Sequence, residues 1–115
     1  MKKLFVLLVF ISVSIFAQSK SAKAQFEVDG VCGMCKVRIE KAAIKTKGVK
    51  MATWDVDSHI ITIIYDQNKT SLEEIQANIA AVGHDTDLSK ASIYDYEQLD
   101  ACCKYKDPEV VKDHQ

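Results

Sequence analysis

The spacing of apolar residues predicts a strand, a helix and two further strands in the first part of the chain. Residues 25–31 alternate between apolar and polar side chains, which is typical of a short strand. Residues 34–46 carry apolar side chains three and four positions apart, which predicts a helix, and Gly48 supplies its stop signal. Residues 49–56 and 59–65 predict two strands joined by a tight turn, and the second is rich in β-branched residues.

A second helix and a weaker strand are predicted to follow. Thr70 or Ser71 is expected to cap this helix, and Gly83 is expected to end it. Its buried face is expected to consist of Leu72, Ile75, Ile79 and Val82. Residues 84–91 predict a short last strand, although Leu88 is its only large apolar residue.

The order of these elements predicts an α+β fold, a ferredoxin-like βαββαβ sandwich with both helices on one face of an antiparallel sheet. A short C-terminal helical extension is expected behind Ser92, because four apolar residues follow at helical intervals. These four residues are Ile93, Tyr96, Leu99 and Cys103. Beyond Pro108 the polar composition predicts a loose tail.

Residues 1–24 have the three-part pattern of a secretory signal peptide, with two lysines, an apolar run and small-residue sites. The apolar run, about 14 residues long, is shorter than the roughly 20 residues that span a bilayer. We therefore expect cleavage, with no stable membrane insertion afterwards, and a periplasmic or secreted mature protein. Cleavage is expected after Ala17 or after Ala24, and the second site fits the A-x-A rule better.

The charge balance argues against nucleic acid and anionic membranes as partners. The leader carries four of the 15 basic residues and none of the 16 acidic residues, so the mature chain has a net charge of −5. An acidic chain of this kind is not expected to bind phosphate backbones or anionic lipid surfaces. The remaining length is enough for one small domain.

Four cysteines dominate the candidate chemistry, as two close pairs: Cys32 with Cys35, and Cys102 with Cys103. An even number of cysteines in an exported chain suggests disulfides. Pairs this close in sequence, however, would close almost no loop and would constrain the unfolded chain little. Cys32 and Cys35 instead lie where a predicted strand gives way to a predicted helix, so both sulfurs can point at one spot above the helix N-terminus.

The N-terminus of a helix carries unpaired N–H groups and a partial positive charge, which favour thiolate over thiol. The C-x-x-C pair is therefore suited either to attack a disulfide or to bind a soft metal ion. Two thiolates suit Cu(I) best and also accept Hg(II). Zn(II) is a weaker candidate, because structural zinc normally takes four protein ligands.

Four ordered stretches resemble the heavy-metal-associated (HMA) domain family: CGMCKVRIEKA, GVK, YDQNKTSLEEI and AVGHD. The resemblance covers residues 25–90, between the leader and an extension at residues 91–115. It implies a βαββαβ sandwich with Cys32 and Cys35 as metal ligands, as in small copper chaperones, metal-pumping ATPase modules and the periplasmic mercury-binding protein. It also implies that the ion passes to a partner through states in which thiolates of both proteins share it.

The sequence departs from the family pattern at two places. The common family loop is G-M-T-C-x-x-C, but here Gly30 stands at the Met position and Val31 at the Thr position. The floor of the loop must therefore be packed differently. His84 follows a glycine at a position that lies near the metal loop in the family, so it is a candidate third ligand or proton-sensitive gate. An exposed turn histidine is the alternative.

Three roles are open for Cys102 and Cys103. Adjacent residues on a helix point about 100° apart, so these two are not expected to grip one ion together easily. They could fold back over the loop as extra metal ligands, or form a disulfide that locks the metal-free protein. Packing alone, with Cys103 as a small apolar residue, is the third reading.

These observations predict a metallochaperone-like protein that binds Cu(I) through Cys32 and Cys35 and delivers or buffers it outside the cytoplasm. The expected partner is a metal transporter or an efflux component, met by transient contact. The chain is expected to be a monomer or a metal-bridged dimer. No catalysis is expected, because the sequence offers no nucleophile–base arrangement and no phosphate loop.

Two other functions remain as alternatives. A thiol–disulfide oxidoreductase would use the same two loop cysteines, but the single proline of the chain lies in the tail and cannot face them. A metal-switched interaction module would dock through residues 91–115.

Overall fold

The computed structural model describes residues 20–115. The predicted signal peptide at residues 1–24 therefore lies mostly outside the described residues. Within the described part, none of the helices has the length and apolar character needed to cross a membrane.

Three antiparallel strands form the sheet, in the order β1-β3-β2. They are β1 (Ser21–Glu27), β2 (Val49–Trp54) and β3 (Ile60–Asp66). The central strand, β3, is the one whose β-branched residues gave the strongest strand signal, and it turns Ile61, Ile63 and Tyr65 toward the core. The predicted antiparallel sheet is confirmed.

β1 begins four residues earlier than the sequence indicated. Ser21 pairs with Asp66, and the register continues without interruption to Glu27 opposite Ile60. Ala22 and Ala24 alternate toward the core and pack against it. Small residues such as these alanines are also typical of a leader cleavage site. This explains why the sequence pattern placed the start of the strand too late.

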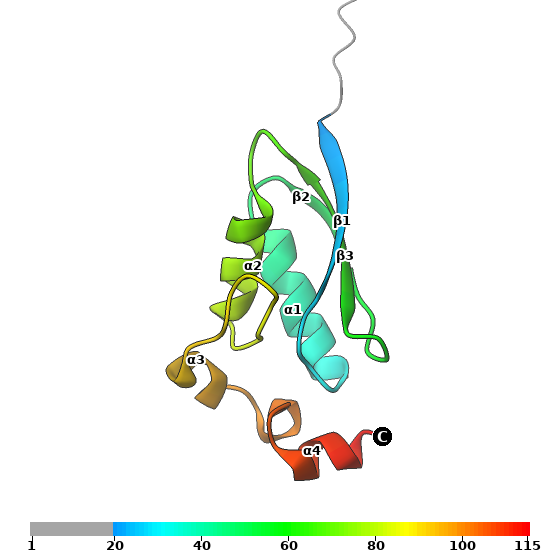
Figure 1. Ribbon diagram of the computed structural model, residues 1–115, viewed down its shortest axis with the longest axis vertical. Helices are drawn as coiled ribbons and strands as arrows, with labels where there is room; N and C mark the ends of the chain where they lie inside the picture. Colours follow the sequence, from blue (N-terminus) through cyan, green and yellow to red (C-terminus); the bar gives the residue numbers. More distant parts are fainter. Residues whose placement is uncertain (1–19) are drawn as a thin grey trace, which may run out of the picture.

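Two helices, α1 (Gly33–Lys45) and α2 (Leu72–Ala80), pack on the same face of the sheet, as predicted (Figure 1). The buried face of α1 includes Ile39 and Ala43. Ser71 caps α2 by accepting a hydrogen bond from the Glu74 backbone N–H, at 3.2 Å between nitrogen and oxygen.

The expected last strand at residues 84–91 is reduced to one isolated bridge between Val28 and Thr86. The backbone of this segment makes local hydrogen bonds instead. The Thr86 N–H donates to the Ser89 carbonyl, the Ser89 N–H donates to the Thr86 hydroxyl, and the Ala91 N–H donates to the Asp85 carboxylate. These groups are therefore not available to a longer ladder.

The C-terminal extension is built from three short pieces instead of one helix. They are α3 (Ile93–Glu97), the 3₁₀ turn η1 (Ala101–Cys103) and α4 (Pro108–Asp113). The predicted Ser92 cap is present and accepts a hydrogen bond from the Asp95 N–H at 3.0 Å. Figure 1 shows that η1 and α4 lie across the end of the sandwich where α1 begins.

The prediction of a loose tail beyond Pro108 is wrong. Asp107 caps α4 by accepting a hydrogen bond from the Glu109 N–H at 3.0 Å, and Pro108 occupies the first turn. A capping aspartate followed by proline is a helix-start signal, which the polar composition of the segment obscured.

Candidate functional site: a sulfur cluster under the C-terminal segment

The two loop cysteines lie at the start of α1, as the sequence predicted. Cys32 is the residue before the helix and has extended backbone angles, while Cys35 lies in the first turn. The Lys36 N–H donates to the Cys32 carbonyl at 3.0 Å, so Cys32 already belongs to the helical hydrogen-bonding pattern. The two sulfur atoms are 3.4 Å apart. The loop therefore presents two thiols to a single point.

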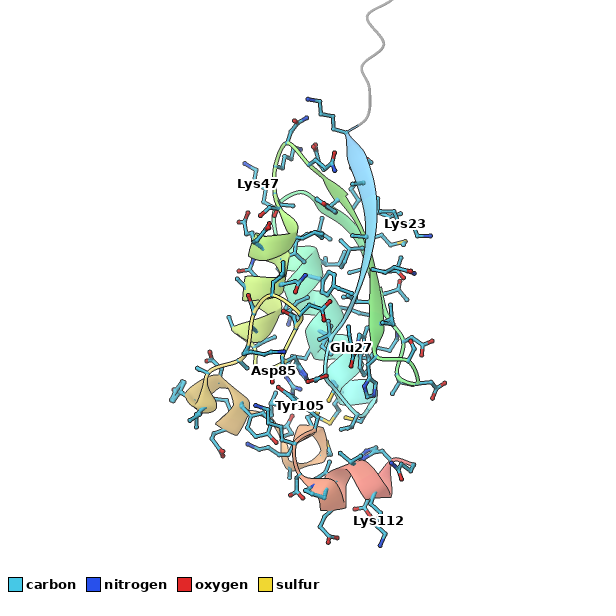
Figure 2. The ribbon with its side chains drawn as sticks, viewed as in Figure 1. Lys23, Glu27, Lys47, Asp85, Tyr105 and Lys112 are labelled. Carbon is cyan, nitrogen blue, oxygen red and sulfur yellow. The ribbon has the colours of Figure 1, made fainter. Side chains whose placement is uncertain are left out.

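The C-terminal segment brings both of its cysteines to the same place. The Cys103 sulfur lies 3.3 Å from that of Cys32, and the Cys102 sulfur lies 3.9 Å from that of Cys103. Cys102 also approaches the thioether of Met34, at 3.4 Å between sulfurs. In Figure 2 the sulfur atoms gather between the start of α1 and the turn beneath it. All four cysteines are free thiols.

The expectation that Cys102 and Cys103 diverge too far to serve one site does not match their placement. Their sulfurs and that of Cys32 all lie within 4.8 Å of one another. The expectation assumed an α-helix, whereas these residues belong to a three-residue 3₁₀ turn laid over the loop. Cys103 turns inward and is fully buried, and Cys102 turns toward Met34.

The thiols of the site differ in acidity. Burial opposes the ionisation of Cys32, but hydrogen bonds lower its pKa to about 7. These hydrogen bonds come from the Cys35 backbone, the Cys103 and Cys35 thiols and the Met34 backbone. Burial raises the pKa of Cys35, and it raises the pKa of Cys103 to about 12. Cys32 is therefore the thiol that ionises first near neutral pH.

Arg38 also helps to position the C-terminal cysteines, and the sequence pattern did not predict this role. Its guanidinium donates to the Asp100 carboxylate at 3.0 Å, which joins α1 to the residue that precedes η1. Although burial opposes its charge, the Cys103 and Cys35 thiols and Asp100 raise the pKa of Arg38. Arg38 is not among the buried residues of α1, and no local sequence signal reveals that Asp100 in the C-terminal segment pairs with it.

Trp54 packs beneath the loop that carries Cys32 and Cys35. A Cβ atom added to Gly30 would lie 3.0 Å from two indole carbons and 3.1 Å from the Cβ of Cys35. The indole N–H donates to the carbonyls of Val28 and His59, at 3.0 and 3.1 Å. The loop floor is therefore packed by the indole ring of Trp54, which occupies the space beside Gly30, as the change from Met to Gly at this position led us to expect.

Tyr105 anchors the C-terminal segment to the sandwich. Its hydroxyl donates to the Gly83 carbonyl at 2.7 Å and accepts from the Asp85 N–H at 3.0 Å, and Figure 2 shows it beside Asp85. Leu99 is buried against Gly83. Gly83 has a φ of 104°, and a side chain there would meet both Leu99 and the Asp95 carbonyl within 2.8 Å.

His84 is fully buried beside Tyr105. The group of mutually close metal-binding atoms at this site consists of the Cys32, Cys102 and Cys103 sulfurs and does not include His84. Its Nδ1 lies 2.7 Å from the Asp29 carbonyl oxygen, which can only accept, so Nδ1 carries the proton. Its ring stacks on Tyr105 with centroids 5.5 Å apart. Burial lowers the pKa of His84 to about 4, so the ring is neutral and Nε2 keeps its lone pair. A ligand role for His84 stays a prediction.

Comparison with known proteins identifies a family for residues 25–85. The model of the heavy-metal-associated domain matches residues 25–85. The copper chaperone CopZ of Staphylococcus haemolyticus is 34% identical over 59 residues, which cover 50% of this chain and 87% of that protein. A zinc-transporting ATPase of Synechocystis sp. is 36% identical over 78 residues, which cover 66% of this chain but only 11% of the ATPase.

Solved structures show the same architecture. The structure of a CopZ metallochaperone superimposes with a TM-score of 0.55 at 26% identity, and the match covers 56% of this chain and 98% of that one. The ferredoxin-like sandwich predicted from the sequence is therefore confirmed. The match leaves much of this chain uncovered, and the matched family region ends at residue 85, before Cys102 and Cys103.

Proposed function

The chain belongs to the heavy-metal-associated domain family, and from that premise we propose that it binds Cu(I) through Cys32 and Cys35. It delivers or buffers the ion outside the cytoplasm. The observation that carries the proposal is the all-sulfur donor set at the start of α1, where two thiols lie 3.4 Å apart. Thiolate and thioether sulfur are the ligands that soft Cu(I) prefers.

The acidity of Cys32 supports binding near neutral pH. A metal ion binds thiolate, so each thiol must release its proton, and the cost of this release falls as the pKa approaches the surrounding pH. The pKa of Cys32, lowered to about 7, favours thiolate formation at this sulfur over the other thiols of the site. Zn(II) and Hg(II) remain competitors for the same sulfur atoms.

Delivery is proposed to occur by transient contact with a metal transporter or efflux component. Met34 and Val37 are exposed beside the loop, with 50% and 65% of their surface accessible, and they offer an apolar contact at the edge of the site. Under this proposal the ion passes between thiolates of the two proteins and no catalytic step is needed.

The test is a Cu(I) competition titration of the fully reduced chain, with Zn(II) and Hg(II) run in parallel. We expect tight Cu(I) binding that weakens strongly when Cys32→Ser and Cys35→Ser are combined, because both loop thiols are then gone. An insulin-reduction assay on the same preparations addresses the oxidoreductase alternative, which the lowered pKa of Cys32 favours. Reduced protein that takes no Cu(I) from the competitor yet reduces insulin would contradict the proposal.

Export is proposed from the leader pattern, and the pairing of β1 supports the first of the two predicted cleavage sites. Cleavage after Ala24 would delete Ser21 to Ala24, whose partners run from Asp66 to Ile63 on β3. We therefore expect cleavage after Ala17, which leaves the whole of β1. Intact-mass measurement of the protein from the extracytoplasmic fraction should give a mature chain that begins at Gln18. A chain that begins at Gln25, or full-length protein in the cytoplasm, would contradict this expectation.

A further inference from the structure

We propose that Met34 and Cys102 form a second Cu(I) subsite, linked to the loop site by a shared Cys103 thiolate, so that one chain holds two ions. This inference rests on the proposed function, because it extends the same site. It concerns the C-terminal segment, which lies beyond the residues that match the family.

The five sulfurs form a continuous chain in space. The order is Cys35, Cys32, Cys103, Cys102 and Met34, with successive separations of 3.4, 3.3, 3.9 and 3.4 Å. A soft d10 ion such as Cu(I) is satisfied by two or three sulfur ligands. Five sulfurs in a row therefore exceed what one Cu(I) can use.

The middle of this chain can serve two ions at once. A thiolate sulfur has more than one lone pair, so it can bind two Cu(I) ions as a bridge. Cys103 is in contact with Cys32 on one side and Cys102 on the other. An inner ion is then held by Cys35, Cys32 and Cys103, and an outer ion by Cys103, Cys102 and Met34.

The balance of protons and charge is compatible with two ions. Each thiol loses its proton to water as its bond to copper forms, and copper stays in the +1 state throughout, so no oxidant or reductant is needed. Four thiolates and two Cu(I) ions leave two negative charges. The Arg38 guanidinium pairs with Asp100, two residues before Cys102, and so lies close to this excess of negative charge.

The two subsites differ in their access to solvent. Cys35 and Cys103 are fully buried, and Cys32 is 9% exposed. Met34 is half exposed and Cys102 is partly buried. The outer ion is therefore the one that a partner reaches first, and the inner ion is enclosed by η1.

The second subsite is positioned by contacts that involve no sulfur. Asp100 pairs with Arg38 at 3.0 Å, and Tyr105 binds the Gly83 carbonyl at 2.7 Å. These contacts lie on either side of Cys102 and Cys103 in sequence. They hold the turn over the loop, so the ligands are preorganised and the metal does not have to recruit the segment.

The experiment is a Cu(I) titration of the reduced full chain, with bound copper counted by native mass spectrometry. We expect two Cu(I) per monomer in the wild type, and one in Met34→Leu and in Cys102→Ser. Met34→Leu keeps the apolar volume and removes only the sulfur. Met51→Leu is the matched control, because Met51 is an exposed methionine on β2, and it should keep two ions.

The outcomes separate this inference from the proposed function. One Cu(I) per wild-type chain, or two ions that persist in both Met34→Leu and Cys102→Ser, would overturn the second subsite and leave the loop site in place. Two ions that appear only in a dimer would overturn it as well. A wild-type chain that takes up no Cu(I) at all would instead overturn the proposed function.

Discussion

Cys32→Ser is expected to lower Cu(I) affinity more than serine at any other single cysteine. The Cys32 sulfur touches those of both Cys35 and Cys103, at 3.4 and 3.3 Å. When Cys35 is replaced, Cys32 and Cys103 remain as an adjacent pair. When Cys103 is replaced, Cys32 and Cys35 remain. Loss of Cys32 removes both short contacts, and with them the thiol whose pKa is lowered to about 7.

The affinities of three single variants, Cys32→Ser, Cys35→Ser and Cys103→Ser, measure this ranking. We expect the Cys32 variant to lose more than the roughly 10–100-fold that is typical of an outer-shell change at a metal site. The other two should lose less, because each keeps one adjacent pair. Equal losses for Cys32→Ser and Cys35→Ser, with none for Cys103→Ser, would show that the C-terminal thiol does not substitute for a loop ligand.

Trp54→Ala is expected to lower the free energy of unfolding by about 3–5 kcal/mol, the usual cost of deleting a large buried aromatic side chain. Trp54 is 1% exposed, and its N–H donates to two carbonyls. Such a loss is a large part of the total stability of a small domain. Trp54→Phe keeps an aromatic ring in the core, so it is the better background for measuring the contact with Gly30.

The contact between Trp54 and Gly30 is measured with a double-mutant cycle. Gly30→Ala should cost roughly 1–3 kcal/mol in the wild type, because its Cβ would meet the indole at 3.0 Å. In Trp54→Phe the cost should fall, since the two indole carbons in question are gone. Gly33→Ala is the control, because a Cβ there meets nothing within 4 Å. An equal cost of Gly30→Ala in both backgrounds, measured by denaturant unfolding, would show that the indole is not the obstacle.

Elements governed by local sequence were predicted well. β3 is dense in β-branched residues, and α2 has both its capping Ser71 and an apolar face, so each was placed close to its observed bounds. The C-x-x-C loop was also correctly placed at the start of α1, because the change from strand to helical spacing marks that junction.

Features that depend on distant contacts were not predicted. The position of Cys102 and Cys103 depends on the Arg38–Asp100 pair and on Tyr105 reaching Gly83, and neither has a local signature. Met34 lies between the two loop cysteines, but its approach to Cys102 depends on the same fold-back. The last strand was mispredicted for a different reason, because local hydrogen bonds within residues 85–91 compete with the strand ladder.

The placement of Trp54 beneath the loop has an optical consequence. It is the only tryptophan of the chain, and its indole lies against Gly30 and stacks on His59 with ring centroids 5.6 Å apart. The tryptophan fluorescence of the protein therefore comes from a single indole at the floor of the loop that carries Cys32 and Cys35. A shift toward longer wavelengths would report exposure of the loop floor, so loading, partner contact and release can be followed in real time without a dye.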